Sequence, residues 1–119
     1  MSSQATARYV GDVAIIDVSG RITLGQGAGV LRTLIKDLLK AGERELLVNL
    51  KDVSYMDSAA IGELVGAYAT ISSAGGVIKL LNPQGRVSEI LAVAKLYTVF
   101  ETFSDEALAL GSFPSTPAG

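Results

Sequence analysis

Two spacings of apolar residues recur along this chain, and each predicts a different kind of element. Residues 46–50 and 77–81 are short, almost wholly apolar runs, a pattern typical of strands covered on both faces. Residues 9–10 and 13–18 flank Gly11-Asp12, which fits a two-residue turn with glycine in its first position. The chain is therefore predicted to open with an antiparallel hairpin.

Apolar residues spaced three and four apart predict helices between and after these strands. The first helix ends at Gly42, the second begins near Ser58 and ends at residues 75–76, and a third follows residues 82–85. A short extended piece at residues 99–100 precedes a fourth helix, in which residues 104–107 supply an N-cap and two acids in the first turn. The predicted apolar faces of the first three helices are Leu31, Leu34, Ile35, Leu38 and Leu39, then Ile61, Leu64, Val65 and Tyr68, then Val87, Ile90, Leu91 and Ala94.

This order of elements predicts an α/β fold with a mixed sheet and about four helices. Only the opening pair of strands is joined tightly enough to be antiparallel, and the later strands are separated by helices that make right-handed parallel crossovers. Residues 20–23 are expected to form a turn and residues 52–57 a loop. One domain is expected at residues 9–110, after an N-terminal segment (1–8) near whose end the first strand starts. Residues 111–119 are rich in Ser, Pro and Gly and are predicted to be disordered.

Composition narrows the classes of function. The chain has 119 residues, is 49% hydrophobic and carries a formal net charge of −2, which suits one domain with a sizeable core. Its Lys and Arg residues are scattered rather than clustered, which argues against nucleic acid as the main partner. Cysteine and histidine are both absent, so disulfides, thiolate metal sites and the commonest general base are excluded.

The beginning of the sequence lacks the features of a secretory signal. Residues 1–7 are short and polar, without a basic region followed by an apolar run. No apolar stretch of the sequence approaches the roughly 20 residues that a membrane span needs. We therefore expect a cytoplasmic protein without a membrane span.

A glycine pattern ahead of the first helix invites a nucleotide-binding interpretation. Gly25, Gly27 and Gly29 alternate, but the dinucleotide fingerprint requires glycine where Val30 stands, and residues 20–24 separate the pattern from its strand. A Gly-Lys-Ser/Thr phosphate loop is absent from the sequence. A flexible loop that caps the first helix is the favoured interpretation.

Acidic residues supply no recognisable metal site. Their spacing fits no common ligand pattern, and the segment from Asp52 to Asp57 does not resemble an EF-hand. Solvated turn residues are the simpler interpretation, and no metal or cofactor is expected. The carboxylates considered are Asp12, Asp17, Asp52, Asp57 and Glu63.

Ser58 is the strongest candidate site because it lies between the end of a predicted buried strand and the start of a predicted helix. Backbone N–H groups are unpaired in the first turn of a helix, and the helix dipole is positive there. As a catalytic nucleophile Ser58 would need a base, and the neighbouring Asp57 is a poor one. The Gly-x-Ser-x-Gly elbow is also absent, so no catalytic residue is predicted. An N-cap and a phosphoacceptor remain open, and local sequence alone favours the cap.

Three segments together resemble the STAS domain family, most closely its bacterial anti-sigma factor antagonists. They are residues 18–23, 46–50 and 53–62, and the likeness extends over about residues 9–110. Asp57-Ser58 is its most specific part. The sequence departs from the family pattern at Ala60, where glycine is usual, and at Thr23, where many antagonists have aspartate.

The resemblance implies a regulatory protein rather than an enzyme. Family members bind an anti-sigma factor that is also a serine kinase, and thereby release a sigma factor. The kinase uses ATP to phosphorylate the serine that aligns with Ser58, binding is then lost, and a PP2C-like phosphatase restores the active form. The partner surface implied in this way comprises Asp57, Ser58, Ala59, Ala60, Ile61, Gly62 and Glu63, with Gly20, Arg21 and Thr23 at its rim.

Two other hypotheses stay open at this point. One is a STAS scaffold without phosphorylation, in a signalling assembly or as an accessory subunit of a lipid ABC transporter. The other is a small nucleotide-binding enzyme that uses residues 25–29. The sequence leaves the oligomeric state undetermined.

Overall fold

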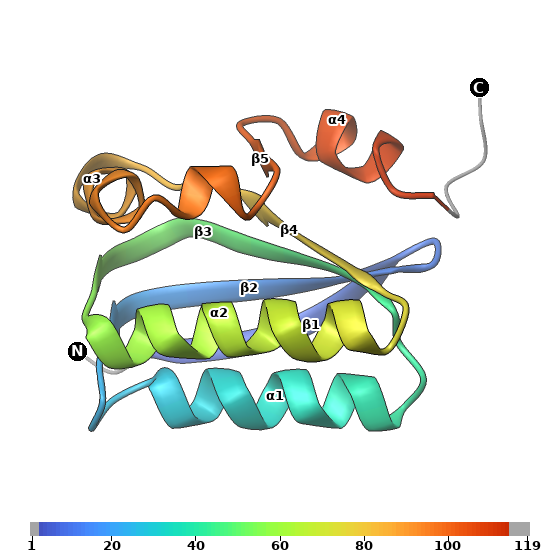
Figure 1. Cartoon of the computed structure of the whole chain (residues 1–119), viewed down its shortest axis with the longest axis horizontal. Helices are drawn as coiled ribbons and strands as arrows, with labels where there is room; N and C mark the ends of the chain where they lie inside the picture. The colour runs from blue at the N-terminus through green and yellow to red at the C-terminus, as the bar shows by residue number, and fades with distance from the viewer. Residues whose placement is uncertain (1–2, 115–119) are drawn as a thin grey trace.

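A five-stranded mixed sheet organises the computed structural model, which describes residues 3–114. The strands lie in the order in which they occur along the chain (Figure 1). The hairpin of β1 and β2 is antiparallel, and β3, β4 and β5 continue the sheet in parallel, as the sequence predicted. The bounds are β1 Gln4–Val10, β2 Val13–Ile22, β3 Glu45–Met56, β4 Val77–Leu81 and β5 Thr102–Phe103.

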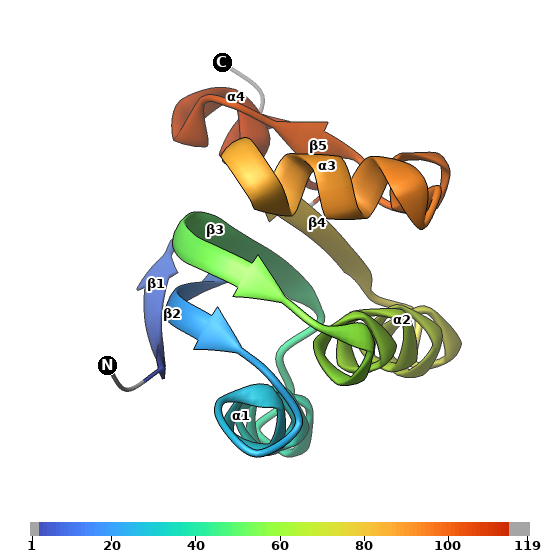
Figure 2. The same cartoon turned by 90° about the vertical axis from the view of Figure 1, so that its left-hand side faces the viewer.

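Four α-helices and one 3₁₀ turn connect and follow the parallel strands within the described part of the chain. They are α1 (Ala28–Lys40), α2 (Ser58–Ser73), α3 (Gly85–Val93), η1 (Leu96–Thr98) and α4 (Glu106–Gly111). Figures 1 and 2 show α1 and α2 side by side along the sheet, with α4 on its far side. None of the described helices is long and apolar enough to cross a membrane.

Two apolar clusters cover the two faces of the sheet. Ala14 and Ile16 of β2 belong to the larger cluster, which includes buried residues of α1, α2 and α3. Val13 and Ile15 belong to the smaller cluster, which also includes the buried Ala109 of α4. Because successive side chains of a strand point to opposite faces, this division places α1, α2 and α3 on one face of the sheet and α4 on the other.

The ends of β2 and β3 differ from the prediction. Residues 20–22 continue β2 rather than forming a turn, and residues 52–56 continue β3 rather than forming a loop. Two register shifts interrupt the pairing, one between Asp17 and Ser19 and one between Gly20 and Arg21. Such irregularities break the two-residue alternation, which is why the sequence pattern did not reveal these extensions.

The buried face of α2 is also offset from the predicted stripe. Leu64 is buried as expected, but Val65 and Tyr68 are 42% and 37% exposed. The residues that α2 buries are Ala60, Leu64, Ala67 and Ile71. The side of α2 that faces the sheet therefore combines two alanines with Leu64 and Ile71, whereas Val65 and Tyr68 lie outside it.

The two ends of the domain differ from the prediction as well. β1 begins at Gln4 and so occupies most of the segment 1–8. Residues 99–100 are not extended; the strand lies at Thr102–Phe103 instead. Asp105 rather than Ser104 caps α4.

The C-terminal residues up to 114 are ordered by packing and by one lysine. Phe113 is 3% exposed and belongs to the smaller apolar cluster. The Lys79 ammonium is also buried, and it donates hydrogen bonds to the Ser112 carbonyl and hydroxyl oxygens at 3.1 and 2.9 Å. The prediction of disorder was therefore wrong for residues 111–114, and positions 115–119 lie outside the described part.

A half-exposed ionic cluster holds the beginning of α4 against the hairpin. Arg8 contacts Asp17 and Glu106, each at 2.6 Å, and Asn49 donates to Asp17 at 2.9 Å. Burial alone would raise the pKa of Asp17, but hydrogen bonds from Arg8 and Asn49 outweigh it and lower that pKa. The Arg8 hydrogen bond likewise lowers the pKa of Glu106. Asp17 is therefore a paired strand residue, and its interpretation as a solvated turn residue was wrong.

This cluster predicts an acid-dependent contribution to stability. Both carboxylates have lowered pKa values in the folded chain, so their contribution is present at neutral pH and is lost as the pH falls below about 5. Replacing Arg8 by Gln should cost about 1 kcal/mol at pH 7, because half-exposed pairs contribute little each, and should lower Tm by about 4 °C. Thermal denaturation from pH 7 to pH 3 measures both effects.

The matched control is Arg86→Gln, because Arg86 has no ion-pair partner within residues 3–114. We expect it to leave Tm and its acid dependence unchanged. An Arg8 variant that loses Tm with falling pH as steeply as wild type would contradict this role of the cluster.

Candidate functional site

Ser58 is the first residue of α2 and follows β3 after a single intervening residue. Met56 ends the strand in the core, and the Asp57 N–H donates to the Ile22 carbonyl oxygen at 3.1 Å. Asp57 is the N-cap of α2, so the alternative in which Ser58 itself caps the helix was wrong. The Ser58 side chain is exposed, and its hydroxyl has no hydrogen-bond partner among the residues that the structure describes.

The Asp57 carboxylate is shared between two backbone segments. Its Oδ1 accepts from the Ala60 N–H at 3.0 Å, and its Oδ2 accepts from the Leu24 N–H at 2.9 Å. These hydrogen bonds, that from Ala60 first, hold the pKa of Asp57 below its usual value. An ionised carboxylate engaged in this way by backbone donors is poorly placed to act as a base for the neighbouring hydroxyl.

Leu24 belongs to a tight turn, residues 23–27, that leads into α1. Thr23 and Gln26 exchange two backbone hydrogen bonds, at 2.7 and 3.0 Å, and the Ala28 N–H donates to the Thr23 carbonyl oxygen at 3.2 Å. Gly27 is the N-cap of α1 with φ of +97°, a conformation that glycine adopts without strain. The glycine pattern thus serves the turn and the start of the helix, as the simpler interpretation predicted, but hydrogen bonds order the loop that this interpretation expected to be flexible.

The structure brings the predicted surface residues to one end of the sheet. One of them, Ala60, does not lie on the surface, because it is fully buried and packs in the larger apolar cluster. Its methyl group therefore faces the core rather than a partner. Glu63 leans toward α1, where it lies 3.8 Å from Arg32, and Arg21 stacks on the Tyr55 ring at 4.5 Å.

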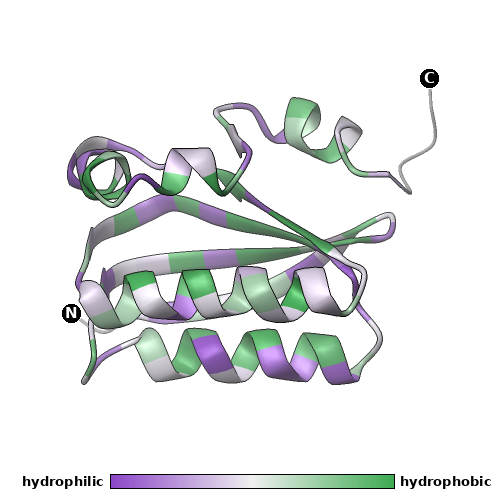
Figure 3. Cartoon of the chain, in the orientation of Figure 1, coloured by the Kyte–Doolittle hydropathy of each residue, from purple (hydrophilic) through white to green (hydrophobic). Residues whose placement is uncertain are grey.

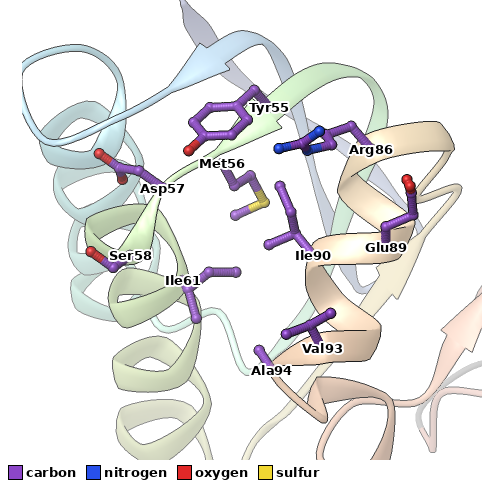
Figure 4. Close-up of a pocket in the computed structure, with 10 residues that line it drawn as sticks. All are labelled: Tyr55, Met56, Asp57, Ser58, Ile61, Arg86, Glu89, Ile90, Val93 and Ala94. Atoms are coloured by element: carbon purple, nitrogen blue, oxygen red, sulfur yellow. The ribbon is translucent and has the colours of Figure 1, made fainter.

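A cavity of about 540 Å³ opens beside Ser58, between the start of α2 and α3 (Figure 4). Ile61, Ile90 and Val93 give it apolar walls, and Figure 4 shows Arg86 and Glu89 on the α3 side. The α3 residues were missed as site residues. Ile90 was assigned to a core face by its spacing, and only the fold places α3 next to α2.

The outer surface of α2, on which Val65 and Tyr68 are exposed, is almost free of charge. Glu63 is its only charged residue, whereas α1 carries four, at positions 32, 36, 37 and 40. Figure 3 shows this contrast between the two neighbouring helices. An exposed face of this kind is typical of an interaction surface, and it continues directly from Ser58.

The burial of Ala60 leads to a prediction about stability. Ala60→Gly removes a methyl group from the core, worth about 1 kcal/mol, in addition to the helix penalty of about 0.5–1 kcal/mol. Ala69→Gly, at an exposed position of the same helix, should carry only the helix penalty. Urea denaturation of the two variants measures the difference, and equal losses would contradict a core role for the Ala60 methyl group.

Comparisons with known proteins agree with this architecture. The STAS domain model matches residues 4–109. The anti-sigma-B factor antagonist of Bacillus subtilis is 33% identical over 86 residues, which are 72% of this chain and 77% of that protein.

Solved structures extend the likeness to the fold. A crystal structure of an anti-sigma factor antagonist from Mycobacterium paratuberculosis has a TM-score of 0.84 at 17% identity, over 94% of each chain. Bacillus SpoIIAA in its phosphorylated form has a TM-score of 0.70 at 19% identity, over 89% of this chain and 96% of that one. At these identities the structures demonstrate a shared fold, whereas the family match and the Bacillus subtilis relative establish descent. The chain therefore belongs to the STAS domain family and is related within it to the anti-sigma factor antagonists.

Proposed function

We propose that this chain binds an anti-sigma factor of the serine-kinase type and is switched off when that kinase phosphorylates Ser58. The observation that carries the proposal is an exposed serine hydroxyl at the first position of α2, next to the apolar outer surface of the same helix. The relationship to anti-sigma factor antagonists supplies the class of partner.

The position of Ser58 favours a modification that leaves the fold intact. A phosphate adds about −1.5 to −2 charges at pH 7, and the N-terminus of a helix carries roughly +0.5 of dipole charge that offsets part of them. Because the side chain is exposed, the phosphate would displace no core residue. The phosphorylated and unphosphorylated forms of SpoIIAA have TM-scores of 0.70 and 0.68 to this chain, which supports a fold that tolerates the group.

The position of Ser58 also favours loss of anti-sigma factor binding once the serine is phosphorylated. A partner that covers the start of α2 already meets the ionised Asp57 carboxylate, whose pKa is lowered by backbone donors. A dianion on the next residue would have to be desolvated with it. A loss of ~4 kcal/mol at the interface is about a thousandfold in affinity. Phosphorylation would in this way change the interface and leave the domain itself folded.

The chemistry of the switch is supplied by other proteins. In the forward step the Ser58 hydroxyl oxygen bonds to the γ-phosphorus of ATP, ADP leaves, and a base of the kinase takes the hydroxyl proton. A PP2C-like phosphatase would reverse the modification by hydrolysis. This chain contributes an accessible hydroxyl and a binding surface, and it acts as a regulator and a substrate.

Phosphorylation is tested first. Purified serine-kinase anti-sigma factors from the source organism are incubated with ATP and the chain, and the products are examined by intact-mass spectrometry and peptide mapping. We expect one phosphate, on Ser58, and none on Ser58→Ala. Phosphorylation of a different residue, or none with every such kinase, would count against the proposal and favour the scaffold hypothesis.

Binding to the anti-sigma factor is tested by introducing a negative charge at position 58. Calorimetry with the kinase identified above should show that Ser58→Ala binds like wild type. Ser58→Asp should keep its Tm but bind at least about tenfold more weakly, a loss of about 1.4 kcal/mol. Ser104→Asp, at an exposed position outside α2, is the control and should bind normally. Equal affinity of wild type and Ser58→Asp would refute the mechanism.

A further inference from the structure

The two most exposed large apolar side chains of the described residues flank Ser58. Val93, on the wall of the α2–α3 cavity, is 85% exposed, and Leu24, in the 23–27 turn, is 79% exposed. Single exposed apolar residues are common on protein surfaces, so exposure alone assigns Leu24 no role. Its backbone setting distinguishes it, because the turn that carries it is ordered and is attached to the site.

Hydrogen bonds within the 23–27 turn and hydrogen bonds to residues outside it both fix its backbone. Hydrogen bonds between Thr23 and Gln26 close it, and a third bond connects it to Ala28 at the start of α1. The Asp57 carboxylate then accepts from the Leu24 N–H itself. A contact residue on a backbone that is already ordered loses little conformational entropy when it binds. An exposed leucine held in this way is suited to contact a partner.

The tether also fixes where Leu24 lies. β2 and β3 end together at the end of the molecule that Figure 2 faces, and the turn and the start of α2 lie next to each other there. The Asp57 carboxylate accepts from the Ala60 N–H with one oxygen and from the Leu24 N–H with the other. It therefore connects the first turn of α2, which carries Ser58, to the 23–27 turn. Leu24, Ser58 and the apolar outer surface of α2 therefore form one continuous surface.

We propose that Leu24 inserts into an apolar pocket of the anti-sigma factor and that Asp57 is the positioning residue that holds it in place. This inference rests on the proposed function and deepens it, because it adds Leu24 to the partner surface and assigns Asp57 a positioning role. Continuity with Ser58 and with the α2 surface favours the anti-sigma factor as the occupant over a second copy of this chain.

The tether is tested without a partner, by amide hydrogen exchange. Asp57→Ser keeps a hydroxyl that can cap α2, but a hydroxyl on this shorter side chain cannot replace both carboxylate oxygens. We expect exchange at the Leu24 amide to become at least about tenfold faster, with a much smaller change at Ala60. A Leu24 amide that exchanges as fast as an unprotected one in wild type would overturn the positioning role of Asp57.

The contact is tested with the anti-sigma factor that phosphorylates Ser58. Leu24→Ala should weaken binding at least about tenfold, a loss of about 1.4 kcal/mol, without changing Tm. Leu108→Ala is the matched control, because Leu108 is 67% exposed on α4, and it should bind within about twofold of wild type. Equal effects of the two substitutions would overturn the contact.

A double-mutant cycle separates positioning from a merely structural effect. If Asp57 positions Leu24, adding Leu24→Ala to Asp57→Ser should cost less affinity than adding it to wild type. Strictly additive losses would overturn the coupling.

The remaining outcomes distinguish this inference from the proposed function. Wild type that binds no anti-sigma factor overturns both. Wild type that binds, with Leu24→Ala unimpaired, overturns the Leu24 contact alone. A Leu24→Ala variant that changes self-association in sedimentation velocity, but not anti-sigma factor binding, assigns the residue to a second copy and also overturns the proposal.

Discussion

One carboxylate joins the two helix starts at the functional end of this domain. β2 and β3 run parallel and end together, so the segments that lead into α1 and α2 leave the sheet as neighbours. Asp57 bonds across that junction, with its N–H to β2, one carboxylate oxygen to the first turn of α2 and the other to the 23–27 turn. The exposure of Ser58, the cap of α2 and the location of Leu24 all depend on this arrangement.

The packing of α2 explains why this end of the domain has an apolar surface. α2 carries apolar residues on more than one side, and the sheet can cover only one of these sides. The covered side buries Ala60, Leu64, Ala67 and Ile71. Val65 and Tyr68 remain exposed. The exposed apolar residues of α2 thus form a face whose composition is suited to contact another protein.

The sequence predicted the architecture better than the surface. The hairpin at Gly11-Asp12, the alternation of strands and helices, and the location of Ser58 at the start of α2 were all predictable, because local patterns encode them. The STAS resemblance was confirmed as well. The extensions of β2 and β3 were not predictable, since bulges disrupt the alternation, and neither were the outward face of α2 or the α3 side of the cavity. The hydrogen bond from Leu24 to Asp57 spans 33 positions, and no local pattern encodes such a contact.

The ionic and lysine contacts of α4 have a consequence for how such a regulator can evolve. Arg8 with Glu106, and Lys79 with Ser112, fasten the C-terminal elements over the face of the sheet opposite to α2. Substitutions there would alter the fraction of molecules that unfold and are degraded, and hence the cellular abundance of the protein. Residues around Ser58 would be untouched by such changes. The abundance of the protein and its binding of a partner can therefore change independently during evolution, because residues on opposite faces of the sheet determine them.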